Sequence, residues 1–289
     1  MANKQYISII RLFEHCAVDT TGEELNLPRI KKHLNAEFSH SNTGFIEVGG
    51  YSYTRQDVFE ELEQTDFPAR LGYHKRLWEN KNILNFLENN QLNLQEIGTE
   101  FNNFYCEKEF DVFFSPYFAA PFNYASRNFL NELQFGNLAK LHLYDDFLQP
   151  MDREEAFKAT RIFLQENLRT LNNVSEQNYK IIYSKIKLWI HNDWPVFFNR
   201  LPDEFYDIKT AIFSILINLT VKLQHSHKGD CKKISHKLVA VTDIPTELED
   251  LALNNHKVYT GAADGQSKSY GWLVWVGIIV IKLIALGGC

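Results

Sequence analysis

The sequence predicts a mainly helical, multi-helix domain with a small β-hairpin near its N-terminus, followed by one C-terminal transmembrane helix. Three observations indicate this fold class. Apolar residues recur at helical spacing through most of the chain, a Gly-Gly pair separates two short β-prone runs, and the last stretch is almost entirely apolar. With 45% hydrophobic and 23% charged residues, the chain has the composition of a folded globular protein.

The net charge indicates which partners the protein does not bind, and the cysteine pattern indicates the redox state of its compartment. The chain carries 36 acidic against 30 basic residues, and its net charge of −6 argues against nucleic-acid binding by the body of the protein. Its cysteines, Cys16, Cys106, Cys231 and Cys289, lie far apart without a CxxC pair, so we expect free thiols in a reducing compartment. The glycine-rich phosphate-binding motifs are absent, and we expect no cofactor.

Residues 1–66 predict a small N-terminal unit of helix, hairpin and helix. Gln5–His15 fits a short helix or a strand, whereas Leu27–Phe38 has the apolar spacing of a helix. Phe45–Tyr53 contains two β-prone runs around Gly49-Gly50, which predicts a two-residue hairpin turn.

Thr54 predicts the start of the next helix. A threonine hydroxyl at an N-cap accepts a hydrogen bond from the backbone of the residue three positions later, here Asp57. The helix that it begins, Arg55–Gln64, ends before Pro68. We therefore place a domain boundary near residue 66.

Residues 67–259 predict a helical bundle domain. We find no fixed period of about 34 or 40 residues, so a regular repeat protein is not supported. The most apolar helix, Asp203–Leu223, is expected at the centre of the core, because Asp207 and Lys209 argue against a second membrane span. The other predicted helices are Ala69–Glu88, Leu92–Tyr105, Glu107–Phe114, Phe122–Gln134, Leu138–Leu148, Asp152–Asn167, Asn173–His191, Lys232–Val239 and Thr246–Leu253.

The densest aromatic stretch of the body is Phe101–Phe129. Pro116 and Pro121 within it predict a kinked connection between two helices rather than one helix. Core packing explains most of these aromatic residues, and the alternative is a groove for a partner helix or a lipid. If the body has a partner-binding site, we expect its contacts to be Phe113, Tyr117, Phe118 and Phe122.

No complete metal or catalytic site emerges from the remaining polar residues. His225, His227, Cys231 and His236 fit no common zinc spacing, so no metal is expected. The same stretch is rich in lysine and favours a basic solvated surface. We expect it to face anionic lipid headgroups through Lys228, Lys232, Lys233 and Lys237.

Tyr270–Leu286 predicts a single membrane anchor. A helix of its 17 residues reaches about 25 Å, slightly less than a hydrocarbon core of about 30 Å. Tyr270, Trp272 and Trp275 mark one interface, and Lys282 lies near the other end, where its long side chain can reach the headgroups. A buried core helix is the alternative, but a polar linker over residues 260–269 separates the segment from the body.

These features predict a single-pass, tail-anchored protein with a cytoplasmic N-terminal domain. The N-terminus lacks a signal peptide, and the lysines before the span outnumber Lys282 behind it. We expect an adaptor or structural subunit without enzymatic activity that binds membrane lipid through its C-terminal helix and a protein partner or itself through its body. Two alternatives are a membrane-tethered enzyme with a non-standard site and a membrane-disrupting protein that acts through its C-terminal helix.

Overall fold

The computed structural model describes residues 5–20, 25–41, 43–104 and 108–261 of the chain. Within these ranges the protein forms 15 α-helices and one two-stranded antiparallel sheet, which confirms the mainly helical fold class and the hairpin near the N-terminus. None of the described helices is both long and apolar enough to cross a bilayer. The predicted anchor, Tyr270–Leu286, and most of the predicted linker lie outside the described residues.

Contacts between residues divide the chain into two compact units. Unit 1 comprises residues 1–125 and 146–156, and unit 2 comprises residues 126–145 and 157–289. The separate N-terminal unit expected over residues 1–66 lies wholly within unit 1 and stays a prediction.

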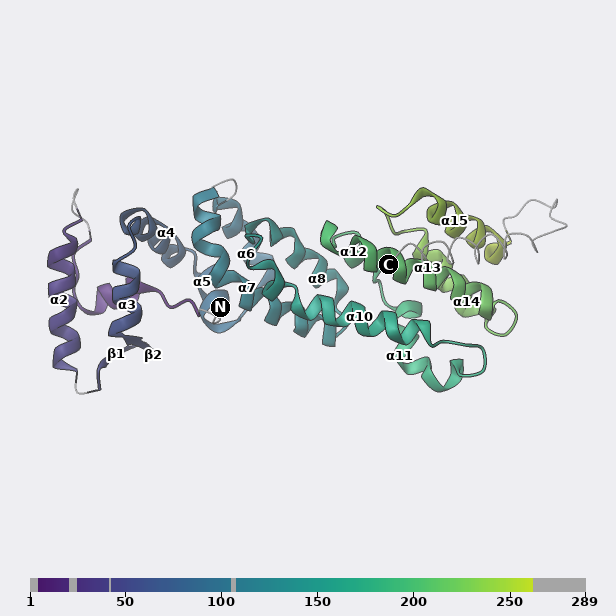
Figure 1. Cartoon of the computed structure of the whole chain (residues 1–289), viewed down its shortest axis with the longest axis horizontal. Coiled ribbons are helices and arrows are strands. Elements are labelled where there is room, and N and C mark those ends of the chain that lie inside the picture. The colour runs from purple at the N-terminus through teal and green to yellow at the C-terminus, as the bar shows by residue number, and fades with distance from the viewer. Residues whose placement is uncertain (1–4, 21–24, 42, 105–107, 262–289) are drawn as a thin grey trace, which may run out of the picture. The chain divides into compact units, whose positions relative to one another are not determined.

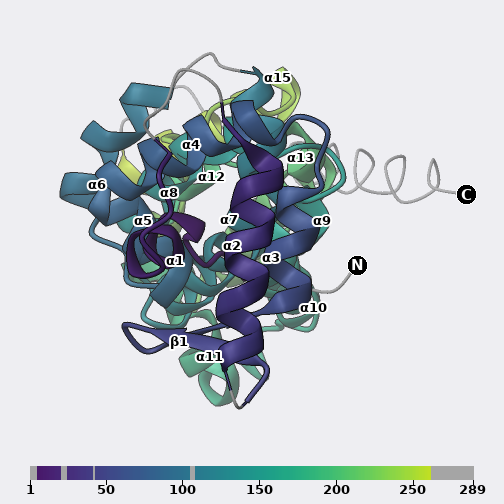
Figure 2. The ribbon, with the colours of Figure 1, turned by 90° about the vertical axis from the view of Figure 1, so that its left-hand side faces the viewer.

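Unit 1 contains the hairpin together with the N-terminal helices of the chain (Figure 1). Its elements are α1 Ile9–His15, α2 Leu27–His40, β1 Phe45–Val48, β2 Tyr51–Thr54, α3 Arg55–Leu62, α4 Phe67–Glu79, α5 Lys81–Asn89, α6 Leu94–Phe101, the 3-10 helix η1 Asn102–Phe104, most of α7 Lys108–Asn131, and α9 Arg153–Ala156. α2 lies alongside α3, with β1 close to α2 (Figure 2).

The hairpin forms as its turn residues predict. Gly49 and Gly50 have φ angles of 59° and 87°, the left-handed values that a two-residue hairpin turn requires. The register pairs Ile46 with Tyr53, and both side chains are buried. Opposed residues of an antiparallel pair point to the same face, so the hairpin covers the core on one side only.

Thr54 ends β2 and caps α3, as predicted. Its hydroxyl oxygen accepts a hydrogen bond from the backbone N–H of Asp57 at 3.1 Å and lies 2.6 Å from the Asp57 carboxylate. The cap fixes the start of α3, and with it the direction of the side chains that follow on this helix.

The predicted helix Ala69–Glu88 is wrong as a single element, because it breaks into α4 and α5 at Asn80. Asn80 has a non-helical backbone, and its side-chain amide donates to the Arg76 carbonyl at 2.7 Å. Asparagine competes in this way with the helical backbone hydrogen bonds. The break allows α5 to turn and bring Glu88 to the N-terminal segment.

The predicted break between Glu107–Phe114 and Phe122–Gln134 is also wrong. Pro116 and Pro121 both lie inside the continuous helix α7. Each interior proline costs about 3 kcal/mol in an isolated helix. Here the fully buried side chains of the same helix, Phe110, Phe114, Phe118 and Phe122, offset that cost by packing in the core.

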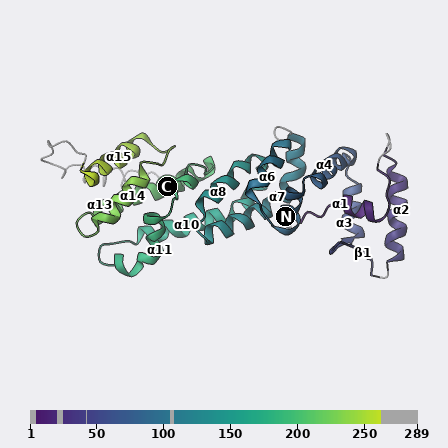
Figure 3. The same ribbon diagram turned by 180° about the vertical axis from the view of Figure 1, so that it is seen from behind.

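The regular elements of unit 2 over its described residues are all helices (Figure 3). After the end of α7 it contains α8 Phe135–Leu141, most of η2 His142–Phe147, α10 Lys158–Asn172, α11 Tyr179–His191, α12 Pro195–Phe198, η3 Asp203–Phe205, α13 Tyr206–Leu223, α14 Lys228–Leu238 and α15 Thr246–Thr260. α13 packs against α10, α14 and α15, and its Ile212, Phe213 and Leu216 are fully buried. The most apolar predicted helix therefore lies in the core.

Candidate functional site

The four predicted partner contacts on α7 are core residues. Phe113, Tyr117, Phe118 and Phe122 are at most 6% exposed. Phe118 packs edge-to-face against Phe122, with ring centroids 5.5 Å apart. The structure thus supports core packing, which the sequence also suggested, and Tyr117 is the one of the four that lines the cavity described below.

The predicted basic surface lies on α14. Lys228, Lys232 and Lys233 are exposed and Lys237 is half-buried, whereas Cys231 faces the core of unit 2. No group of three or more histidine, cysteine or acidic side chains is placed to hold a metal ion in the part of the chain that the structure describes. The predicted anchor residues, Tyr270, Trp272, Trp275 and Lys282, lie outside that part.

A cavity of about 450 Å³ opens in unit 1 between the N-terminal segment, β2, α3, α4 and α7. Its lining combines aromatic hydroxyls, carboxylates and a few apolar side chains. The lining residues are Gln5, Tyr6, Ile7, Ile9, Tyr53, Asp57, Val58, Glu60, Glu61, His74 and Tyr117. Tyr6, Glu61, His74 and Tyr117 are buried and form the inner wall, whereas Gln5, Asp57 and Glu60 are exposed.

A chain of hydrogen bonds runs through the inner wall. The Tyr6 hydroxyl lies 2.9 Å from Nδ1 of His74, and Nε2 of His74 lies 3.0 Å from Glu61 Oε1. Arg70 donates two hydrogen bonds to the same carboxylate, at 2.6 and 2.9 Å. Burial alone would raise the pKa of Glu61, but the hydrogen bonds from His74 and Arg70 outweigh it and lower that pKa to about 2.

The ionised Glu61 fixes the direction of the hydrogen bond at its own end of this chain. A carboxylate only accepts hydrogen bonds, so His74 donates through Nε2 to Glu61, and its Nδ1 faces the Tyr6 hydroxyl. Burial, together with the nearby Tyr117 and Glu88, raises the pKa of Tyr6 well above 10. Tyr6 therefore remains a protonated hydrogen-bond donor and is unsuited to act as a nucleophile.

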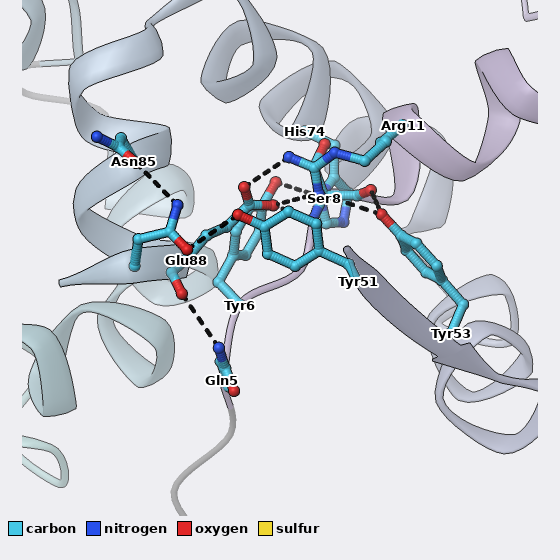
Figure 4. A network of polar contacts seen from close by, with 10 residues as sticks. Gln5, Tyr6, Ser8, Arg11, Tyr51, Tyr53, His74, Asn85 and Glu88 are labelled. Atoms are coloured by element: carbon cyan, nitrogen blue, oxygen red, sulfur yellow. Dashed lines mark hydrogen bonds and ion pairs between the residues drawn. The ribbon is translucent and has the colours of Figure 1, made fainter. Parts of the chain in front are cut away.

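A second buried network holds the N-terminal segment in the cavity wall (Figure 4). Arg11 binds the Glu88 carboxylate on α5 through both terminal nitrogens, at 2.6 and 2.9 Å. Glu88 also accepts the backbone N–H of Ser8 at 2.8 Å, and the Tyr53 hydroxyl donates to the Ser8 carbonyl at 2.9 Å. The segment that carries Tyr6 is thus fastened to both α5 and β2.

Sequence reasoning missed these buried polar residues, although helical spacing contains a signal for one of them. His74 lies three residues after Leu71 and three before Leu77, on the buried face of α4. A polar residue on an apolar face requires a buried partner. The partner itself, Glu61, is identified only by the tertiary structure.

The lining of the cavity offers hydrogen-bonding, aromatic and charged groups. Among the described residues that line the cavity, the hydroxyl groups belong to tyrosines, and the pKa of each is raised by burial, for Tyr53 to about 12. They supply hydrogen bonds and aromatic faces, and the carboxylates supply negative charge. Comparisons with protein-family models, curated proteins and solved structures find no match to this chain.

Proposed function

We propose that the chain is a membrane-tethered interaction protein without enzymatic activity, in which a C-terminal helix anchors a folded helical body. The observation that carries this proposal is the apolar segment Tyr270–Leu286, whose 17 residues are interrupted only by two glycines and Lys282. Its aliphatic residues each favour insertion into the membrane by about 0.3–0.6 kcal/mol. Together they outweigh the cost of inserting one lysine near the end of the segment.

The end of the described chain is compatible with a tether. α15 ends at Thr260, and Gly261 follows in a left-handed conformation with φ of 76°, a common way for a helix to terminate. Residues 260–269 then serve as the proposed linker. The exposed Lys228, Lys232 and Lys233 would each add about 1 kcal/mol of attraction to an anionic cytoplasmic surface.

The cavity in unit 1 supports a binding role for the body. Its inner wall is held by two buried networks, so its shape is set before any ligand arrives, and preorganisation reduces the cost of binding. The enzyme alternative has support from the Tyr6–His74–Glu61 chain, but the raised pKa of Tyr6 favours hydrogen-bond donation over nucleophilic attack.

Paired charges placed in the middle of the proposed anchor test the tether. Ile279→Lys combined with Val280→Lys adds about 6–8 kcal/mol to the cost of insertion, because two lysines replace two aliphatic residues that favour it. We expect the wild-type chain to remain in membranes after alkaline carbonate extraction and the lysine variant to be released. The matched variant, Ile279→Ala with Val280→Ala, should stay with the membrane. Release of the wild-type chain by carbonate would contradict the proposal.

A leakage assay separates the tether from the membrane-disrupting alternative. A tether predicts that vesicles containing the full-length chain retain a trapped fluorescent dye as well as empty vesicles do. Dye release that rises with the amount of protein would favour membrane disruption instead.

A further inference from the structure

We propose that the cavity in unit 1 binds an alkylammonium group, presented either by a free primary amine or by a lysine side chain of another protein. The inference rests on the proposed interaction function and names the chemistry that the body would recognise.

Charge is the first argument for a cationic ligand. Three carboxylates line the cavity, those of Asp57, Glu60 and Glu61, and the described lining residues include no lysine or arginine. Arg70 is not among the lining residues, and its ion pair with Glu61 compensates that one charge. Asp57 and Glu60 make no ion pair among the described residues, so the cavity keeps negative charge at its exposed side.

The aromatic lining is the second argument. The rings of Tyr6 and Tyr117 meet edge-to-face with centroids 5.2 Å apart, and Tyr53 lines the same cavity. Aromatic faces attract cations, and neighbouring residues of unit 1 already use this interaction. The Arg11 guanidinium lies 4.0 Å from the Tyr51 ring centroid, and that of Arg70 lies 4.8 Å from Phe113.

Size and ligand geometry favour an organic cation over a metal ion. A volume of about 450 Å³ lies within the range of small-molecule sites and exceeds the needs of a single ion. The described carboxylates of the lining do not converge as metal ligands do. An alkyl chain can pack against Ile7, Ile9 and Val58 while its ammonium group faces the acids.

Titration of the full-length chain in nanodiscs with two amines and a neutral analogue tests the proposal. The probes are n-butylamine, Nα-acetyl-lysine methylamide and Nα-acetyl-norleucine methylamide, followed by saturation-transfer NMR. We expect at least one amine to bind and the neutral norleucine compound not to bind. Tighter binding of the lysine compound than of butylamine points to a protein side chain, and equal or weaker binding points to a free amine.

Two variants that each remove one negative charge test whether the amine binds in the cavity. Glu60→Gln removes a carboxylate from the cavity and should weaken amine binding about fivefold. Glu63→Gln removes an exposed carboxylate close by in sequence but outside the lining, and should leave binding unchanged. Absence of amine binding, or equal losses in both variants, would overturn the inference. Because nanodisc incorporation is scored separately, loss of anchoring is distinguishable from loss of amine binding.

Discussion

At the scale of single residues, Glu61 is the residue at which the hydrogen-bond chain of the inner cavity wall ends. The Glu61 residue is 6% exposed, and its carboxylate is the common partner of Arg70 and His74. A buried charge is tolerated only when its partners compensate the loss of solvation. Glu61 thus couples α3 to α4 at the site where we place ligand binding.

Removing this charge should destabilise the protein more than any exposed substitution. Glu61→Gln leaves Arg70 without its carboxylate, and breaking a buried ion pair costs about 3–5 kcal/mol. Urea unfolding measures the loss, with Glu63→Gln as the exposed control, expected within about 0.5 kcal/mol of wild type. A Glu61→Gln variant as stable as wild type would show that the pair contributes nothing.

The same carboxylate predicts a pH dependence of stability. Its pKa is about 2 in the folded protein against an ordinary value of 4.5, so the unfolded state takes up the proton more readily. The stabilising contribution of Glu61 is complete above about pH 4.5 and is lost as the pH falls towards 2. The difference in unfolding free energy between wild type and Glu61→Gln should therefore shrink between pH 5 and pH 3, whereas a constant difference would contradict this assignment.

At the scale of elements, the hairpin turn gives a direct test of local chemistry. Gly50 has a φ of 87°, which residues with an L side chain rarely adopt, so Gly50→Ala should lower the free energy of unfolding by about 1–2 kcal/mol. Gly72 lies within α4, and a Cβ added there would meet no other atom within 4 Å. Gly72→Ala should therefore raise the free energy of unfolding by about 0.5–1 kcal/mol. Thermal unfolding of the two variants should show shifts of opposite sign. Equal shifts would mean that the turn geometry does not limit stability.

Elements governed by local chemistry could be predicted from the sequence, and those governed by burial could not. The Gly49-Gly50 turn and the Thr54 cap depend on residues within a few positions of each other. The continuity of α7 through Pro116 and Pro121 depends on the core around it. Interior prolines end a helix only where packing does not offset their cost.

The candidate site lay beyond sequence reasoning for the same reason. Tyr6 and His74 are separated by 68 positions, and Tyr117 and Glu61 by 56. Each side chain alone is compatible with a surface or a core position. Only the folded unit places three tyrosines and three carboxylates around one cavity.

At the scale of the whole molecule, the cysteines report the orientation of the proposed anchor. Burial raises the pKa of Cys16 to about 11 and that of Cys231 to about 12, so both thiols stay protonated and unreactive. In a Cys106→Ser background, Cys289 should then be the reactive thiol. An impermeant maleimide added on the side of the body should label it only after detergent treatment, and Cys289→Ser should abolish the signal. Labelling of intact membranes would contradict the predicted orientation.

The most direct test of the tethered body compares the full-length chain with a chain that ends at Gly261, by carbonate extraction and circular dichroism. We predict that the full-length chain stays in the membrane, while the shortened chain is soluble, helical and cooperatively unfolding. A soluble full-length chain with an aggregating shortened chain would contradict this account, because Tyr270–Leu286 would then be a core helix of the body.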